Sequence, residues 1–336
     1  MSPDLNVKLA DARPPDGDGL AAPSVSAPVG TPNYAATIHS DPATLPADFC
    51  SVVRELERTL EMPVWLLVQH DGEKFDEIDD ELSNAFLSEL GDATDHGPMA
   101  LLLDSPGGYS DCAYRIATYF GKRTKNFTVI VPRVAKSAAT LLALGAHKIL
   151  LGHDAELGPL DAQIYDSERE EYISALDEVQ TLDRLHAFSM ESFDRTMFLL
   201  KGRTHMRTAT LVPMVLQYAA NVAKPLLEKI DAVHYTQMSR ILKVAEEYAR
   251  RLLLVRYPEE VAVRIARHLV EKYPEHGFVI DAAEAVRIKE VLAADAIHLK
   301  IDLVESVSNE HNGLFRRMLP HLGHLTAIGQ LKEIKP

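Results

Sequence analysis

The chain has 336 residues, of which 46% are hydrophobic and 25% charged, so it is long enough to bury a globular core. Its formal net charge of -14 excludes a generally basic surface and makes nucleic acid a poor default partner. The two cysteines, Cys50 and Cys112, show neither metal-ligand spacing nor a disulfide framework, which favours a reducing cytoplasm. No apolar run suits a signal peptide or a membrane span, so we predict no integral membrane segment.

The N-terminal half divides into a leader and an alternating core. Residues 1–45 are rich in Pro, Ala, Asp and Gly without apolar periodicity, and we predict a disordered leader there. From residue 46 to 165, apolar runs alternate with amphipathic segments. The predicted helices are 48–61, 75–90, 110–120 and 137–144, and the predicted strands are 63–70, 99–104, 127–132 and 148–151. This alternation is typical of βαβ units, so we predict an α/β core with a largely parallel sheet.

The rest of the chain changes character. Residues 166–258 carry long helical patterns with few strand-like runs, and we predict a helical arm or cap. Residues 259–305 are expected to complete the core with helices at 259–272 and 282–292. The last segment, 306–336, is predicted to be a weakly ordered tail, and the sequence shows no internal repeat.

Two strand-to-helix turns carry the chemistry. In the first, Gly107 and Gly108 follow a buried strand and leave backbone N–H groups open to a ligand. In the second, Ser137 leads from a strand into a helix whose first residues are small. Both turns lie at the carboxyl ends of parallel strands, where α/β sites form. Each turn alone has an ordinary explanation, a simple turn or a helix N-cap, but their order and spacing together favour one pocket.

Three segments resemble the Clp-protease-class serine peptidases, and most closely the serine dehydrogenase proteinase family, which is grouped with signal peptide peptidase A. They are residues 102–108, 129–140 and 157–161. The resemblance covers about residues 50–165, and the helical arm and residues 276–281 are also similar to that family.

The resemblance implies a Clp-protease/crotonase-like fold and peptidase chemistry. It implies that Ser137 attacks the peptide carbonyl and that the N–H groups of Gly108 and Ala138 form the oxyanion hole, with Gly107 shaping the loop. No glycine-rich dinucleotide fingerprint and no pyridoxal-phosphate motif is evident, and we predict no cofactor.

The residues quoted so far do not identify the general base. Clp protease has a histidine some two dozen positions after its serine, but Pro159 falls near that place here. Signal peptide peptidase A and its relatives use a lysine, which needs burial because desolvation disfavours the ammonium. We predict Lys201 as the base because its flank, Phe198-Leu-Leu, is apolar, although a lysine at a helix end is more commonly solvated.

Other polar residues have more ordinary interpretations. Lys136 adjoins Ser137, but neighbouring side chains usually point apart. His186 is interpreted as a helix-surface residue, and His276 as part of a Pro-Glu-His-Gly turn. Asp161 is able to orient a base but also suits a turn. We predict no metal site, since the 14 histidines form no His-Glu-x-x-His or Cys/His cluster.

Three functions therefore compete. The first is a serine peptidase acting on peptide or protein substrates through an acyl-enzyme on Ser137. The second is a non-catalytic assembly module that keeps the fold without a working base. The third is a crotonase-like acyl-CoA enzyme, which has no special need of Ser137. We also predict a homo-oligomer, because the helical arm is rich in apolar residues.

Overall fold

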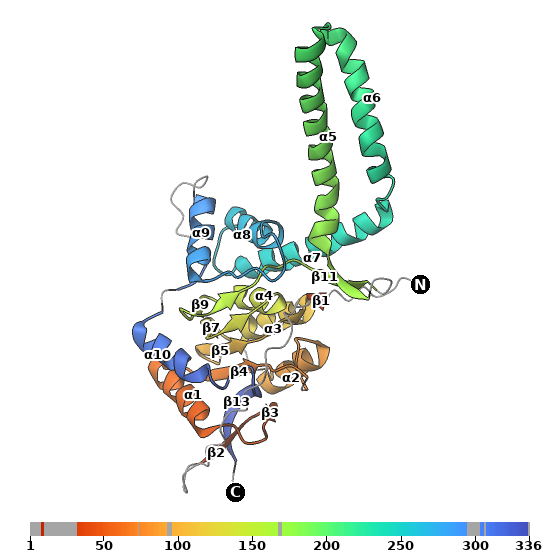
Figure 1. Cartoon of the computed structure of the whole chain (residues 1–336). Helices are drawn as coiled ribbons and strands as arrows, with labels where there is room; N and C mark the ends of the chain where they lie inside the picture. The colour runs from red at the N-terminus through yellow and green to blue at the C-terminus, as the bar shows by residue number, and fades with distance from the viewer. Residues whose placement is uncertain are drawn as a thin grey trace.

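The fold of the chain comes from a computed structural model, which describes a set of ranges along the sequence. These are residues 8–9, 32–72, 74–92, 96–166, 170–293, 303–305 and 307–334. The body is a twisted central sheet covered by helices on both faces, and a long helical hairpin projects from it (Figure 1).

Seven strands form the central sheet. Its parallel part consists of β4 (Val64–Val68), β5 (Met99–Asp104), β7 (Phe127–Val131) and β9 (Lys148–Leu151), in that order. On the other side of β4 lies β13 (Thr326–Ile334), antiparallel to β4 and paired in turn with β2 (Asn33–Ala36) and β3 (His39–Asp41). The predicted α/β class with a mainly parallel sheet is confirmed, and so are the four strands predicted between residues 63 and 151.

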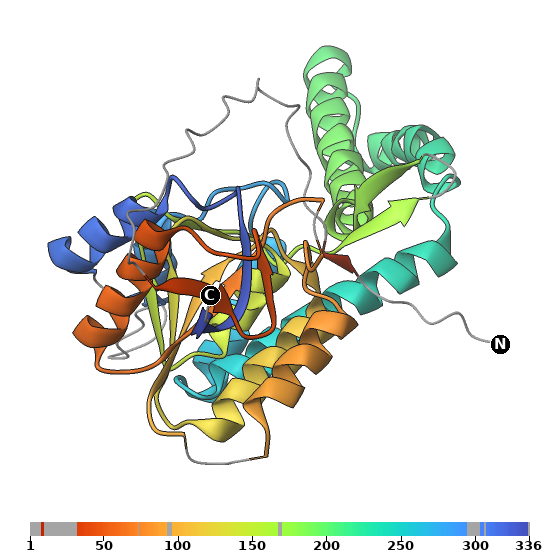
Figure 2. The same ribbon diagram turned by 90° about the horizontal axis from the view of Figure 1, so that it is seen from below.

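Alternating side chains of the parallel strands fill two separate cores. Trp65 and Leu67 face one side of the sheet, while Leu66 and Val68 face the other, as the two-residue period of a strand requires. The first core is covered by α2 (Asp80–Leu90), α3 (Ser110–Arg123), α4 (Ala138–Leu144), α7 (Ala232–Leu253) and α8 (Glu259–Glu271). The second is covered by α1 (Ala47–Leu60) and α10 (Asn309–Met318), which lie on the opposite side of the sheet in Figure 2.

The helical arm starts from a small hairpin. Strands β11 (Gln163–Asp166) and β12 (Glu171–Ser174) pair and lead into α5 (Ala175–Thr204), which packs against α6 (Thr208–Leu227). Helix α7 then returns to the body and packs on α3 and α4, so the end of the expected arm belongs to the core. After α8 comes α9 (Ala282–Ala293). Within the part of the chain that the structure describes, no helix has the length and apolar character needed to cross a membrane.

Two predicted boundaries need correction. The expected leader, 1–45, falls largely outside the described residues, but its last part forms β2 and β3 in the central sheet. The expected tail, 306–336, instead forms α10 and β13, and β13 lies inside the sheet. Ala327 and Ile328 explain the difference, because both are fully buried between β4 and β3 and make this polar-looking segment part of the core.

Candidate active site

Ser137 stands at a tight turn between a short strand and a buried helix. Lys136 and Ser137 separate strand β8 (Val134–Ala135) from α4, and Ser137 is the last residue before the helix. Its φ of 53° and ψ of -116° are rare for a side-chain-bearing residue and cost about 1–3 kcal/mol. Its backbone carbonyl accepts a hydrogen bond from Leu141 N at 3.0 Å, which helps to hold the turn. Strain of this kind is typical of a functional turn.

The hydroxyl of Ser137 is buried and unpaired. The residue is 1% exposed, and Oγ has no hydrogen-bond partner among the described residues. It therefore does not act as an ordinary N-cap, since a capping serine accepts an N–H from its own helix. A buried hydroxyl without a partner costs about 1–3 kcal/mol, so its retention calls for another role.

The glycine loop lies directly against this turn. Gly107 has a φ of 116°, and a Cβ added to it would lie 3.1 Å from Ser137 Cβ and 3.3 Å from Ala138 N. Gly108 has a φ of 142° and is held beside Ile78, which donates to Gly107 O and accepts from Tyr109 N, each at 2.7 Å. The structure thus brings together the two turns that the sequence singled out.

The predicted oxyanion donors have different surroundings. Gly107 N–H donates to Ser105 Oγ at 3.1 Å, so this glycine shapes the loop and is not a free donor. Ala138 is the first residue of α4, and the first N–H groups of a helix have no partner inside it. These N–H groups point out of the N-terminal end of α4, where the helix dipole favours negative charge. The N–H groups of Ala138 and Gly108 remain the predicted oxyanion hole.

An ion pair between Asp104 and Arg133 connects the two turns. The carboxylate of Asp104, at the end of β5, is fully buried and accepts from Arg133 Nη2 at 2.7 Å and from Val134 N at 3.2 Å. Desolvation still raises the pKa of Asp104, against the opposing effect of the guanidinium. Because Asp104 precedes the glycine loop and Val134 precedes Ser137, this pair fixes one turn relative to the other.

A third segment runs beside Ser137. Strand β10 (Glu156–Leu157) pairs in parallel with β8, and a Cβ added to Gly158 would lie 3.2 Å from Ser137 N. In this segment Glu156 forms an ion pair with Lys136, with 2.7 Å between Nζ and Oε1, although the geometry is not that of a hydrogen bond. The Lys136 ammonium is therefore neutralised by a carboxylate.

The structure does not bring Lys201 to Ser137. Lys201 lies 26 residues after Ala175 (201 minus 175) on α5, which is about 39 Å along the helix axis. Its ammonium is exposed and donates to Met206 O at 2.8 Å. The apolar flank that suggested burial is open to solvent, because Phe198 is 81% exposed at the outer end of the arm. The prediction of Lys201 as the base is wrong for a site built within one chain.

A histidine and a carboxyl that the sequence interpretation treated as turn residues are buried near the third segment. His276 is 5% exposed, and neither ring nitrogen makes a hydrogen bond of good geometry. Burial lowers the pKa of His276 to about 4, and the charge of Lys136 adds to this effect while the main chain of Asp161 opposes it. Burial also raises the pKa of the Asp161 carboxyl to about 6, although hydrogen bonds from Ser174 and Leu176 lower it.

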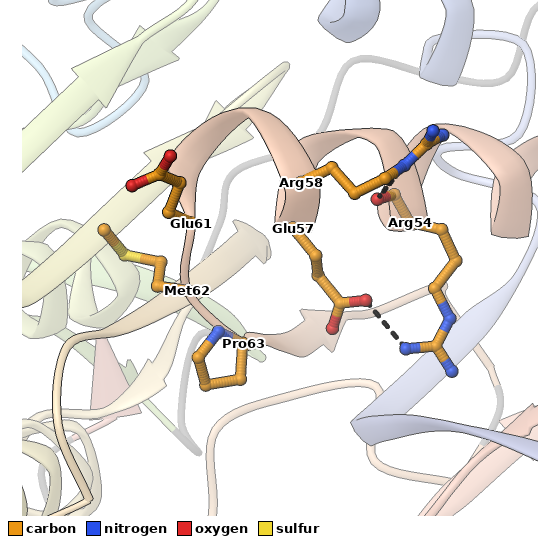
Figure 3. Close-up of a pocket in the computed structure, with 6 residues that line it drawn as sticks. All are labelled: Arg54, Glu57, Arg58, Glu61, Met62 and Pro63. Atoms are coloured by element: carbon orange, nitrogen blue, oxygen red, sulfur yellow. Dashed lines mark hydrogen bonds and ion pairs between the residues drawn. The ribbon is translucent and has the colours of Figure 1, made fainter.

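Other features of the described chain lie apart from this site. The pocket of about 440 Å³ at the end of α1 is lined by Arg54, Glu57, Arg58, Glu61, Met62 and Pro63 (Figure 3). It belongs to the opposite face of the sheet, and its Glu57 already pairs with Arg54 at 2.7 Å. Across the residues that the structure describes, no group of three or more His, Cys, Asp or Glu side chains is arranged to hold a metal ion.

The mainly parallel sheet with helices on both faces fits a Clp-protease/crotonase-like fold. Residues 71–184 match the family model described as ClpP-like SDH-type serine proteinase, so this segment of the chain is similar to that family. The match includes Ser137, both glycines and the 157–161 segment, but it ends before Lys201 and His276.

Two archaeal proteins of Methanocaldococcus jannaschii are similar in sequence. The uncharacterized protein MJ0137 is 26% identical over 212 residues, which is 63% of this chain and 58% of the relative. The uncharacterized protein MJ1495 is 36% identical over 67 residues, which is 20% of this chain and 23% of the relative. The chain thus spans little more than half of the first relative, and neither name states an activity.

Proposed function

We propose that this protein is a serine peptidase that hydrolyses peptide bonds through an acyl-enzyme on Ser137. The observation that carries the proposal is the state of Ser137 itself: a positive-φ residue at a helix start whose buried Oγ has no partner in the described structure. Strain and an unsatisfied hydroxyl both reduce stability, so a serine kept in this state is explained by reaction with a substrate.

The neighbouring backbone is suited to the charge that develops in acyl transfer. When Ser137 Oγ bonds to a carbonyl carbon, the carbonyl oxygen becomes an oxyanion. Ala138 N–H at the start of α4 and Gly108 N–H in the facing loop are the donors that we assign to it. Because Gly107 is in contact distance of Ser137, the loop and the nucleophile approach the same reacting group.

A peptide is favoured over an acyl-CoA by the edge beside this loop. Strand β6 (Gly108–Tyr109) pairs antiparallel with β1 (Lys8–Leu9), a segment from the far N-terminus of the same chain. The edge next to the oxyanion loop therefore accepts an extended chain as an added strand, which is a recurring mode of peptide recognition. This pairing supports peptide substrates without assigning a sequence preference.

The proposal is tested by covalent labelling of the wild-type protein with a fluorophosphonate probe. We expect one adduct per chain, located at Ser137 by mass spectrometry of the digested protein, because only an activated serine reacts at a useful rate. Heat-denatured protein is the control and is expected to stay unlabelled. A folded protein without an adduct at Ser137 across pH 6 to 9 would contradict the proposal and favour the non-catalytic assembly module.

The peptidase is further proposed to work as a homo-oligomer. The arm exposes large apolar side chains to solvent, including Phe198, Met214 and Leu216, which is unusual for a monomer. Between α5 and α6 an apolar cleft is lined by residues such as Leu185, Met190 and Phe193 (all from α5). Light scattering is expected to give a mass that is a multiple of 37.2 kDa. A clean 37.2 kDa species would rule out this assembly.

A further inference from the structure

His276 is a buried histidine whose ring is weakly held. The residue is 5% exposed and neither ring nitrogen makes a hydrogen bond of good geometry, although the main chain of Asp161 is near enough to act on the ring. A buried imidazole is normally satisfied by at least one partner, because leaving its polar atoms bare costs free energy. Its lowered pKa keeps the ring neutral near pH 7, and a neutral imidazole is able to accept a proton. The ring is therefore in the protonation state that a general base needs.

Backbone pairing brings the His276 segment to the site. Leu157 pairs with Ala135 on one side, in the parallel β8–β10 ladder. On its other side Leu157 exchanges two hydrogen bonds with Ile280, at 2.9 Å and 3.0 Å, in an antiparallel bridge. His276 precedes this bridge by four residues (280 minus 276). The segment that begins at Leu157 thus has the Ser137 turn on one flank and the His276 turn on the other.

Two electrostatic contacts link the His276 ring to this region. The main chain of Asp161 acts on the His276 ring, and so does the charge of Lys136, the residue directly before Ser137. Gly158, which lies between the two flanks, has no side chain, and any Cβ there would approach Lys136 Cδ at 2.9 Å. Ser137 and His276 therefore lie on the two flanks of the segment that begins at Leu157, and Gly158 adds no side chain to that segment.

The other bases of this region are already engaged. Lys136 pairs with Glu156. The Asp161 carboxylate accepts from Ser174 Oγ at 2.7 Å and from Leu176 N at 3.3 Å, and so it fixes the start of the arm. Lys201 lies at the outer end of the arm. His276, by contrast, makes neither an ion pair nor a hydrogen bond of good geometry through its ring nitrogens in the described structure.

We propose that His276 is the general base of this site, and this assignment rests on the peptidase function proposed above. As Ser137 Oγ forms its bond to the peptide carbonyl carbon, the hydroxyl proton passes to a ring nitrogen of His276. The imidazolium then gives that proton to the departing amide nitrogen as the C–N bond breaks. In deacylation a water molecule attacks the ester and its proton passes to His276, which returns it to Ser137 Oγ as the acyl C–O bond breaks.

The test compares fluorophosphonate labelling rates of Ser137 in the intact protein and four variants. His276→Gln is expected to slow labelling by at least about 100-fold, as loss of a general base does. His276→Ala is expected to behave in the same way and to recover part of its rate with added imidazole, which a purely structural loss would not do. The matched control is His268→Gln. His268 is also a partly buried histidine with a pKa lowered by burial, and it packs edge-on to Tyr273 outside the site.

The outcomes separate the base from the function on which it rests. A folded wild-type protein that shows no labelling overturns both proposals. Wild-type labelling that persists at the same rate in His276→Gln overturns the base assignment alone and leaves the peptidase standing. The fourth variant, Lys136→Met, covers the alternative base: if it loses labelling while His276→Gln keeps it, the lysine is the base and the assignment to His276 is wrong. Unfolding curves of each variant accompany the rates, and imidazole rescue identifies the base even if His276→Ala is less stable.

Discussion

Replacing Ser137 with alanine is expected to lower peptide-bond cleavage by at least about 10⁴-fold, because the acyl-enzyme is no longer able to form. The fold is expected to survive the change. The hydroxyl is buried without a partner, so removing it relieves an unsatisfied polar group and raises the free energy of unfolding by about 1 kcal/mol. Activity and stability should therefore move in opposite directions. Cleavage of an unstructured protein substrate and a denaturant unfolding curve measure the two effects.

The chain offers a matched control for this substitution. Ser83 on α2 is also fully buried, and its Oγ is likewise unpaired in the described structure, but it lies outside the site. Ser83→Ala should reproduce the gain in stability and leave cleavage unchanged. If Ser137→Ala cleaves as fast as the wild type, Ser137 is not the nucleophile, and a crotonase-like mechanism that relies on the oxyanion hole alone gains support.

The serine turn and the glycine loop that faces it were predictable because their sequence signals are local. Each turn is predicted from the residues directly around it. One buried strand precedes the glycines, and another precedes the serine. Strand-to-helix geometry then follows from short-range rules, such as the positive φ that Gly107 and Gly108 require. The parallel order of β4, β5, β7 and β9 also follows from the alternation of elements along the sequence.

The proposed base was not predictable in the same way. His276 comes 139 positions after Ser137 (276 minus 137), and its segment joins the 157–161 segment through the antiparallel bridge of Leu157 with Ile280. No local spacing in the sequence predicts a bridge of that kind, and the Pro-Glu-His-Gly segment is explained by an ordinary turn. The only hint in the sequence was that residues 276–281 are similar to the family. The apolar flank of Lys201 predicts burial, but apolar residues on an arm are as compatible with exposure as with burial.

The C-terminal strand β13 was likewise not predictable from its local sequence. The segment 326–334 mixes apolar residues with Gly329, Gln330, Lys332 and Glu333, and it lacks a strong strand pattern. Its first half is buried because it pairs with β4 and β3, while its second half pairs with β2 near the rim of the body. The pairing partners lie more than 250 positions earlier in the chain, so only tertiary contacts reveal the strand.

Replacing Gly108 with alanine is the second change with a large expected effect. At a φ of 142° the added Cβ would lie 2.5 Å from Ile78 N and 2.9 Å from Ile78 C, and both are backbone atoms that cannot rotate away. The loop must shift, and the shift moves the Gly108 N–H that we assign to the oxyanion. Loss of one such donor lowers kcat by about 10²–10³-fold. We expect a fall of that size, with a smaller change in KM.

The control for this change is Gly121→Ala on α3. Gly121 has open space around it and lies within a helix, so alanine should leave kcat unchanged and stabilise the fold by about 0.5–1 kcal/mol. Fluorophosphonate labelling adds a second readout for Gly108→Ala, because the phosphonyl oxygen also needs the oxyanion donors. Slow labelling together with a retained unfolding transition means that the loop acts on the reaction. If the variant keeps both its labelling rate and its kcat, Gly108 N–H does not stabilise the oxyanion, and the hole must be built from Ala138 N–H and another donor.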